Sequence, residues 1–95
     1  MNQDLQFDQL VTLSDRTIQK ILMETDSNDL ALSLNASSDE LHEKIFRNMT
    51  DNAIPLIKEL IENLSKSPLE EIVASQERIL AIWRSLEEAA EIERE

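Results

Sequence analysis

The chain of 95 residues contains no glycine and only two prolines, Pro55 and Pro68. A β-rich domain of this length needs several tight turns, and glycine normally supplies the positive φ angles in such turns. Helices joined by short polar loops do not depend on it. The missing glycine therefore predicts an all-α fold. The length allows one domain, over residues 1–95, with one modest core.

The charge balance argues against several classes of partner. Twenty acidic and nine basic side chains give a net charge of -11, which opposes binding to nucleic acid and to anionic membrane surfaces. No apolar stretch approaches the roughly 20 residues of a membrane-spanning helix, so no membrane insertion is expected. The start of the chain, "MNQDLQFDQL", lacks the basic and apolar regions of an export signal. We expect a cytosolic protein.

Apolar periodicity and capping residues divide the chain into five or six helices. Ser14 is expected to cap one helix, and Asp26 or Ser27 a short second one. Ser37, with Glu40 three residues later, predicts a capping box for another. We expect a compact bundle with helices near residues 4–12, 14–24, 27–34, 38–49, 53–64 and 68–92.

Pro55 lies inside the fifth of these segments, where a proline can remove a hydrogen bond. If Thr50 capped the helix, Pro55 would delete one intrahelical bond. If Asp51 or Asn52 is the cap, Pro55 lies in the first turn, where its missing N–H has no intrahelical partner to lose. We predict the second arrangement. Five aliphatic residues of this segment are expected to contribute to the core: Leu56, Ile57, Leu60, Ile61 and Leu64.

The last helix has the clearest predicted start. Ser67 is expected as its cap, with Pro68 as the first helical residue and Glu70 as the third. Its apolar stripe includes Trp83, for which a place in the core is favoured over a role as a partner anchor. The acidic tail opposes the helix dipole, so fraying is expected near the end.

No residue pattern in the chain is typical of catalysis. The single histidine, His42, has no nucleophile beside it, and we interpret it as a solvent-facing residue. Adjacent acids such as Glu70 and Glu71 diverge by about 100° on a helix and lack the spacing and central glycine of a calcium loop. A chain without glycine cannot form the usual phosphate-binding loops. We expect no enzyme activity, no catalytic residue, no cofactor and no metal site.

Charged residues crowd the polar side of the helix that contains Pro55. They are Lys58, Glu59, Glu62 and Lys66. Their spacing allows favourable i,i+4 pairs, Lys58 with Glu62 and Glu62 with Lys66. On spacing alone, a solvated face is favoured over a surface for another protein.

Three stretches of the chain resemble the C-terminal domain family of the flagellar motor switch protein FliG. They read "LSDRTIQKILMETDSNDLALSL", "SSDELHEKIFRNMTDNA" and "ASQERILAIWRSLEEAAEI". They follow the order and the separations of the family motifs and cover essentially all of residues 7–92. The resemblance implies a compact six-helix domain at the rim of a rotor ring.

In that family, the helix that corresponds to residues 53–64 displays charges that meet opposite charges on a cytoplasmic loop of the stator protein MotA. The resemblance therefore implies a torque-transmitting rotor part at the cytoplasmic face of the inner membrane. It also implies a full-length protein that assembles as a ring with FliM, FliN and FliF. The candidate partner-binding residues are Asn35, Arg47, Asn52, Lys58, Glu59, Glu62 and Lys66.

Several charges and glycines of the family motifs are replaced in this chain. The usual lysine falls at Asn35, the usual arginine at Asn52, and one acid of an acidic pair at Leu60. Ala36 and Ala90 occupy positions where the family has glycine. Two hypotheses stay open: a rotor part whose remaining charges contact the stator, and a FliG-like adaptor that binds a cytosolic protein without generating torque. Whether the chain is an isolated domain or a shortened relative also stays open.

Overall fold

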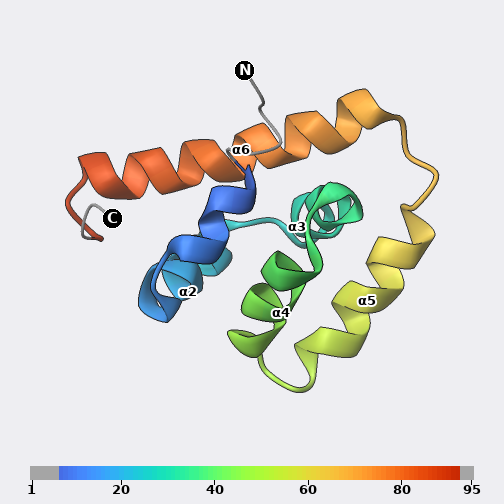
Figure 1. The fold of residues 1–95 in the computed structure, drawn as a ribbon, viewed down its shortest axis with the longest axis horizontal. Coiled ribbons are helices and arrows are strands. Elements are labelled where there is room, and N and C mark those ends of the chain that lie inside the picture. Colours follow the sequence, from blue (N-terminus) through green and yellow to red (C-terminus); the bar gives the residue numbers. More distant parts are fainter. Residues whose placement is uncertain (1–6, 93–95) are drawn as a thin grey trace.

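The structure, a computed structural model, describes residues 7–92 and contains only helices over that range (Figure 1). The all-α prediction is confirmed. Two elements, η1 and η2, are short 3-10 turns. In chain order the elements are η1 (Gln9–Thr12), α2 (Asp15–Glu24), α3 (Ser27–Ser33), η2 (Leu34–Ala36), α4 (Asp39–Arg47), α5 (Ala53–Asn63) and α6 (Leu69–Glu88). The predicted helix near residues 4–12 falls partly outside the described residues.

Helix α3 lies at the centre of the molecule and packs against both α6 and α5. The long helix α6 runs along one side, and an extended loop connects it to α5 at the far end (Figure 1). Helix α2 also packs on α6, and α4 packs on η1. The Cα radius of gyration is 12.5 Å, a value typical of a compact chain of this length.

Side chains cap the first two helices as predicted. The Ser14 hydroxyl accepts the N–H of Thr17 at 3.2 Å, at the start of α2. The Asp26 carboxylate accepts the N–H groups of Asn28 and Asp29, at 3.0 and 3.3 Å, at the start of α3. These bonds satisfy N–H groups that have no partner within the helix.

The cap of α4 is Ser38, and the prediction of Ser37 is wrong by one residue. The Ser38 hydroxyl accepts the N–H of Leu41 at 3.2 Å. The backbone N–H of Ser38 donates to the Asp8 carboxylate at 3.2 Å. The hydrogen bond with Asp8, which is distant in the sequence, therefore favours Ser38 over Ser37 at the start of α4.

Pro55 is the third residue of α5, so its predicted place in the first turn is confirmed. Asn52 occupies the N-cap position, but its side chain makes no capping bond. The carbonyl of Thr50 instead accepts the N–H groups of Ala53 and Ile54, at 3.0 and 3.3 Å. Pro55 follows these two residues and has no N–H. An N–H at this place in the first turn would have no intrahelical partner, so the helix loses no hydrogen bond there.

Helix α6 begins one residue later than predicted, with Pro68 rather than Ser67 at the N-cap. The backbone of Pro68 is extended, with φ -60° and ψ 146°, as an N-cap requires. Its carbonyl accepts the N–H groups of Glu71 and Ile72, at 3.0 and 3.2 Å. No side chain caps this helix start.

The last helix ends at Glu88 rather than near residue 92. The N–H of Glu91 donates to the Leu86 carbonyl at 3.0 Å, and the N–H of Ala90 donates to the Glu87 carbonyl at 3.1 Å. This pair of bonds is a Schellman motif. The motif requires a left-handed residue, and Ala90 supplies it with φ 58°.

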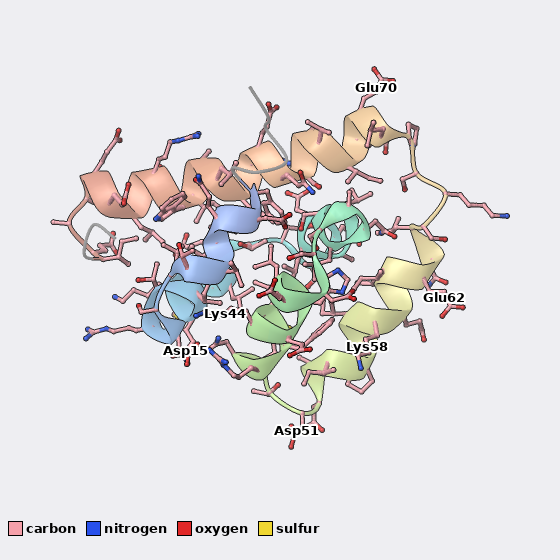
Figure 2. All side chains as sticks on the ribbon, in the orientation of Figure 1. Asp15, Lys44, Asp51, Lys58, Glu62 and Glu70 are labelled. Carbon is pink, nitrogen blue, oxygen red and sulfur yellow. The ribbon has the colours of Figure 1, made fainter. Side chains whose placement is uncertain are left out.

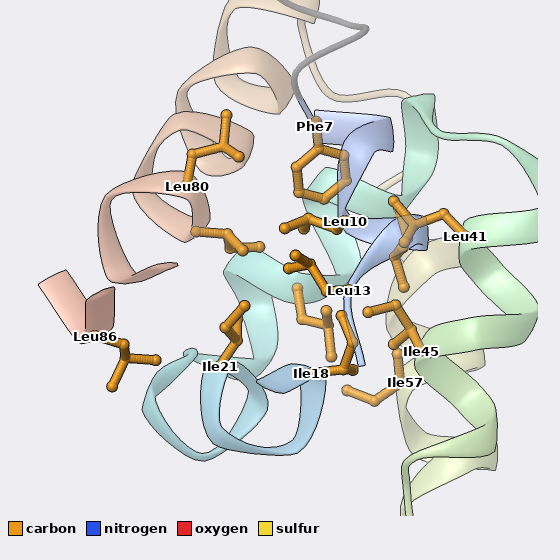
Figure 3. Close-up of a cluster of buried hydrophobic side chains, with 13 residues drawn as sticks. Phe7, Leu10, Leu13, Ile18, Ile21, Leu41, Ile45, Ile57, Leu80 and Leu86 are labelled. Carbon is orange, nitrogen blue, oxygen red and sulfur yellow. The ribbon is translucent and has the colours of Figure 1, made fainter. Parts of the chain in front are cut away.

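Leucine and isoleucine side chains from every helix form the core (Figure 3). Trp83 is partly buried and packs against this core, which confirms its predicted place. Leu56 does not pack in the core, because its side chain is 66% exposed. Its predicted place in the core is therefore wrong. The core residues are Phe7, Leu10, Leu13, Ile18, Ile21, Leu30, Leu34, Leu41, Ile45, Ile57, Ile79, Leu80 and Leu86.

Candidate functional site

Helix α5 stands at the edge of the molecule and buries only Ile57 completely. Figure 2 shows Lys58 and Glu62 along this helix. Both side chains are exposed, as is that of Glu59. A helix that covers the core with a narrow stripe leaves the rest of its circumference to solvent or to a partner.

The ion pairs predicted for this face are not formed in the structure. The ion pairs within residues 7–92 involve Asp15 and Asp29, and none joins Lys58, Glu62 or Lys66. Lys66 lies beyond Asn63, the last residue of α5, so helical i,i+4 geometry with Glu62 does not apply to it. The charges of this face are therefore available to another molecule.

Aromatic contacts with α4 hold Lys58 in place. Its ammonium group lies 5.4 Å from the centroid of the Phe46 ring, within the range of a cation–π interaction. The Phe46 ring meets that of His42 edge to face, with centroids 6.1 Å apart and an angle of 84° between the planes. The ammonium group of Lys58 thus lies beside the Phe46 ring, while the residue as a whole stays exposed.

His42 is half-buried, so its interpretation as a solvent-facing residue is wrong. Its Nε2 lies 2.6 Å from the carbonyl oxygen of Leu34, which can only accept, so Nε2 carries the proton. The histidine therefore ties α4 to η2 and supports the Phe46 ring. This role is structural.

Arg47 does not join the charges of α5. Its guanidinium group donates to the Asp15 carboxylate at 2.7 Å, and the Asn48 amide donates to the same oxygen at 3.1 Å. The Lys44 ammonium group lies 3.7 Å from it (Figure 2). The hydrogen bonds from Arg47 and Asn48 and the nearby positive charge hold the pKa of Asp15 below its usual value. Arg47 clamps the end of α4 to the start of α2.

Asn35 is half-buried and binds backbone rather than solvent. Its side-chain amide donates to the Ala31 carbonyl at 3.0 Å and to the Ile61 carbonyl at 3.2 Å. Ile61 is among the last four residues of α5, whose carbonyls have no N–H donor within the helix. Asn35 therefore secures the end of α5, and its amide donates to backbone carbonyls.

The predicted site residues thus separate into two groups. Asn35 and Arg47 connect helices. The others are exposed along α5 and the turns at its two ends: Asn52, Lys58, Glu59, Glu62 and Lys66. Lys58, Glu59, Glu62 and Lys66 offer exposed charges of both signs, which suits recognition of a complementary charged surface.

Two further observations concern metal binding and membrane-spanning helices. Within the part of the chain that the structure describes, no three histidine or acidic side chains are placed to hold a metal ion together. The described helices also include none with the length and apolar character needed to cross a bilayer.

Sequence reasoning missed a groove of about 460 Å³ on another side of α5. Its lining is mainly aliphatic and comes from α2, α3, α5 and the turns that follow α2 and α4. The lining residues are Leu22, Thr25, Ser27, Leu30, Met49, Ala53, Leu56, Ile57, Glu59 and Leu60. The only hint in the sequence was the width of the aliphatic stripe on α5, which exceeds what one core can cover.

Comparison with known proteins gives consistent matches over nearly the whole chain. The sequence model of the FliG C-terminal domain family matches residues 1–93. The flagellar motor switch protein FliG of Thermotoga maritima is 45% identical over 90% of this chain and 26% of its own length. The corresponding protein of Bacillus subtilis is 38% identical over 90% of this chain and 25% of its own length.

The fold is also shared with a solved structure. A crystal structure of FliG from H. pylori superposes with a TM-score of 0.88 and 30% sequence identity, over 93% of this chain and 42% of that one. The chain spans about a quarter of the length of the curated relatives that it matches. The family match, the relatives and the shared fold agree, and the chain belongs to the FliG C-terminal domain family.

Proposed function

We propose that this chain is a rotor part of a bacterial flagellar motor and that the exposed charges of α5 contact an oppositely charged loop of a stator protein such as MotA. One observation carries the proposal: in a FliG C-terminal domain, Lys58, Glu59 and Glu62 are exposed, and no ion pair within residues 7–92 uses them. The relatives are motor switch proteins and not enzymes.

Exposed charges suit a contact that must form and break repeatedly. Their attraction acts over about 8 Å at physiological ionic strength, so it guides approach, while each exposed pair contributes only about 0–1 kcal/mol once formed. Alternating signs also penalise a partner in the wrong register, because like charges then meet.

The rest of the proposed assembly follows from the same family. A full-length protein would place this domain in a ring at the cytoplasmic face of the inner membrane, together with FliM, FliN and FliF. Lys58 is the basic residue within α5, so an acidic group on the stator loop would meet Lys58. The family assignment favours this role over that of an adaptor without torque.

A charge reversal on α5 tests the proposal. The double substitution Lys58→Glu with Glu59→Lys, introduced into the native gene of a motile host, should abolish rotation, because both ends of the expected contact then face like charges. Arg84→Glu with Glu88→Lys is the matched control, since both residues are exposed on α6. Thermal unfolding of the purified variants checks that the fold is kept.

Normal swimming by the Lys58 and Glu59 double variant, at normal abundance, would overturn the torque proposal. Equal loss of motility in the α6 control would do the same, because it would place the effect outside α5. Binding of a stator loop peptide should also weaken as salt shortens the Debye length from about 30 Å to about 8 Å.

A further inference from the structure

The groove beside α5 is an unfilled apolar surface. Leu22, Leu30 and Leu60 line it from three different helices, and Met49 closes one side. Its volume is about 460 Å³, which falls within the range of about 300–1,000 Å³ that is usual for ligand pockets. The groove therefore has room for several aliphatic side chains.

Leu56 marks this groove as more than a packing defect. Its side chain is 66% exposed although it lines the groove. Exposing a leucine forgoes the roughly 1.5–3 kcal/mol that full burial contributes. A partner that covers Leu56 recovers this free energy, so the groove favours an apolar occupant.

The charge around the groove indicates the sign of that occupant. Glu59 is the charged residue among those that line the groove, and its side chain is exposed. No lysine, arginine or histidine is among the residues that line the groove. The rim is therefore acidic and attracts a basic segment.

The charge of the chain argues against a second copy as the occupant. Each copy carries a net charge of -11, so two copies repel each other as they approach. The occupant is instead a segment of another protein that carries positive charge.

The backbone of the occupant must satisfy its own hydrogen bonds. The residues that the structure describes form only helices, so they offer no strand edge with which an extended peptide could pair. The groove walls are side chains, mostly aliphatic. An extended segment would bury unpaired N–H and C=O groups there, whereas a helix pairs them internally.

We propose that the groove lined by Leu56, Leu60 and Met49 docks an amphipathic helix of another protein. One face of that helix carries aliphatic side chains, and its edge carries lysine or arginine opposite Glu59. This site goes beyond the electrostatic contact proposed above and does not rest on it. The two surfaces share Glu59 and use different sides of α5.

The test uses a defined probe and methyl-resolved NMR on the whole chain. The probe is a synthetic 18-residue amphipathic helix with leucine on one face and lysine on the other. A second peptide keeps the leucine face and carries glutamate in place of lysine. The lysine peptide should shift the methyl signals of Leu56, Leu60 and Met49, and the glutamate peptide should bind at least about tenfold more weakly.

Two pairs of matched variants distinguish binding in the groove from non-specific binding elsewhere on the surface. Leu56→Ser should weaken binding of the lysine peptide at least about tenfold, because a leucine contact of that size is lost. Leu69→Ser should change it less than about twofold, since Leu69 is 67% exposed but lies outside the groove. Glu59→Lys should weaken binding more than Glu62→Lys, because only Glu59 lines the groove.

Several results would overturn the proposal. One is failure of the lysine peptide to bind below millimolar concentration. Another is an equal effect of the Leu56 and Leu69 variants. Concentration-dependent dimers that Leu56→Ser abolishes would assign the groove to a second copy. Groove methyl signals that shift when residues 93–95 are deleted would assign it to the end of the chain itself.

Discussion

Helices α5 and α6 use their aliphatic residues in opposite ways. By composition α5 is the more apolar of the two, yet it contributes only Ile57 to the fully buried set. Helix α6 buries Ile72, Ile79, Leu80 and Leu86 together with two polar residues. The apolar content of a helix therefore does not decide how much of it is covered. Its neighbours decide that, because α6 packs against both α3 and α2, whereas α5 packs mainly against α3.

Polar contacts repeat this difference. Gln76 of α6 is buried and donates to the Ser33 carbonyl at 3.0 Å and to the Ala36 carbonyl at 2.9 Å. Arg78 forms a two-pronged ion pair with Asp29 of α3, at 2.6 and 2.9 Å. The charged residues of α5 make no such pair within the described range. One helix is anchored in the molecule, and the other presents a surface.

The largest expected effect separates the two helices directly. Ile79→Ala should lower the free energy of unfolding by about 2–5 kcal/mol, because it opens a cavity among buried neighbours. Leu56→Ala should change it by no more than about 0.5 kcal/mol, because Leu56 is largely exposed. Urea unfolding of the two variants measures both values. Equal losses would show that α5 is as firmly packed as α6.

The buried amide of Gln76 gives the next effect. Gln76→Leu should cost about 1–3 kcal/mol, because two backbone carbonyls that α6 now satisfies would lose their donor. Gln19→Leu is the control, since the hydrogen bond of Gln19 to Asn48 is exposed. A neutral Gln76→Leu would mean that packing alone holds α6 against α3.

The end of α6 offers a stabilising substitution. Ala90→Gly should raise the free energy of unfolding by about 0.5–1 kcal/mol, because Ala90 has a φ of 58° and glycine adopts this region without strain. Ala36→Gly is the matched control, since Ala36 lies in η2 and has no positive φ. It should be neutral or destabilising. Differential scanning calorimetry distinguishes the two, and a lower melting temperature for Ala90→Gly would contradict the motif.

The smallest effect concerns the exposed clamp at Asp15. The hydrogen bonds of Arg47 and Asn48 lower the pKa of Asp15 in the folded state, so the unfolded chain binds the proton more readily. The contribution of Asp15 to the free energy of unfolding is therefore present above its pKa in the unfolded chain, near 4. It is lost as the pH falls through the lower pKa of the folded state. The stability difference between the native chain and Asp15→Asn should shrink below pH 4. A difference that is constant between pH 7 and pH 2 would contradict this clamp.

Much of the fold could be predicted from local patterns. The caps at Ser14 and Asp26 and the place of Pro55 depend on residues within one turn of each other, and all three predictions hold. The choice between Ser37 and Ser38 could not be made in this way. Both can cap a helix, and the contact of Asp8 with the N–H of Ser38 favours one of them.

The candidate site was less accessible to sequence reasoning. The exposure of Lys58, Glu59 and Glu62 was predicted correctly, because charges at helical spacing away from an aliphatic stripe face solvent. The contact of Arg47 with Asp15 joins residues from two helices, and no spacing rule brings them together. The groove depends on Leu56, which the same stripe had assigned to the core.

The sequence by itself determined that this chain is helical and that it belongs to its family. The lack of glycine, the caps and the aliphatic period act between residues a few positions apart, and the family motifs are strings in the same chain. Only the tertiary structure decided which aliphatic side chains of α5 are covered and which charges are paired. The physical reason is that burial and pairing depend on which distant segment lies against a residue, and no interaction within one helix specifies that segment.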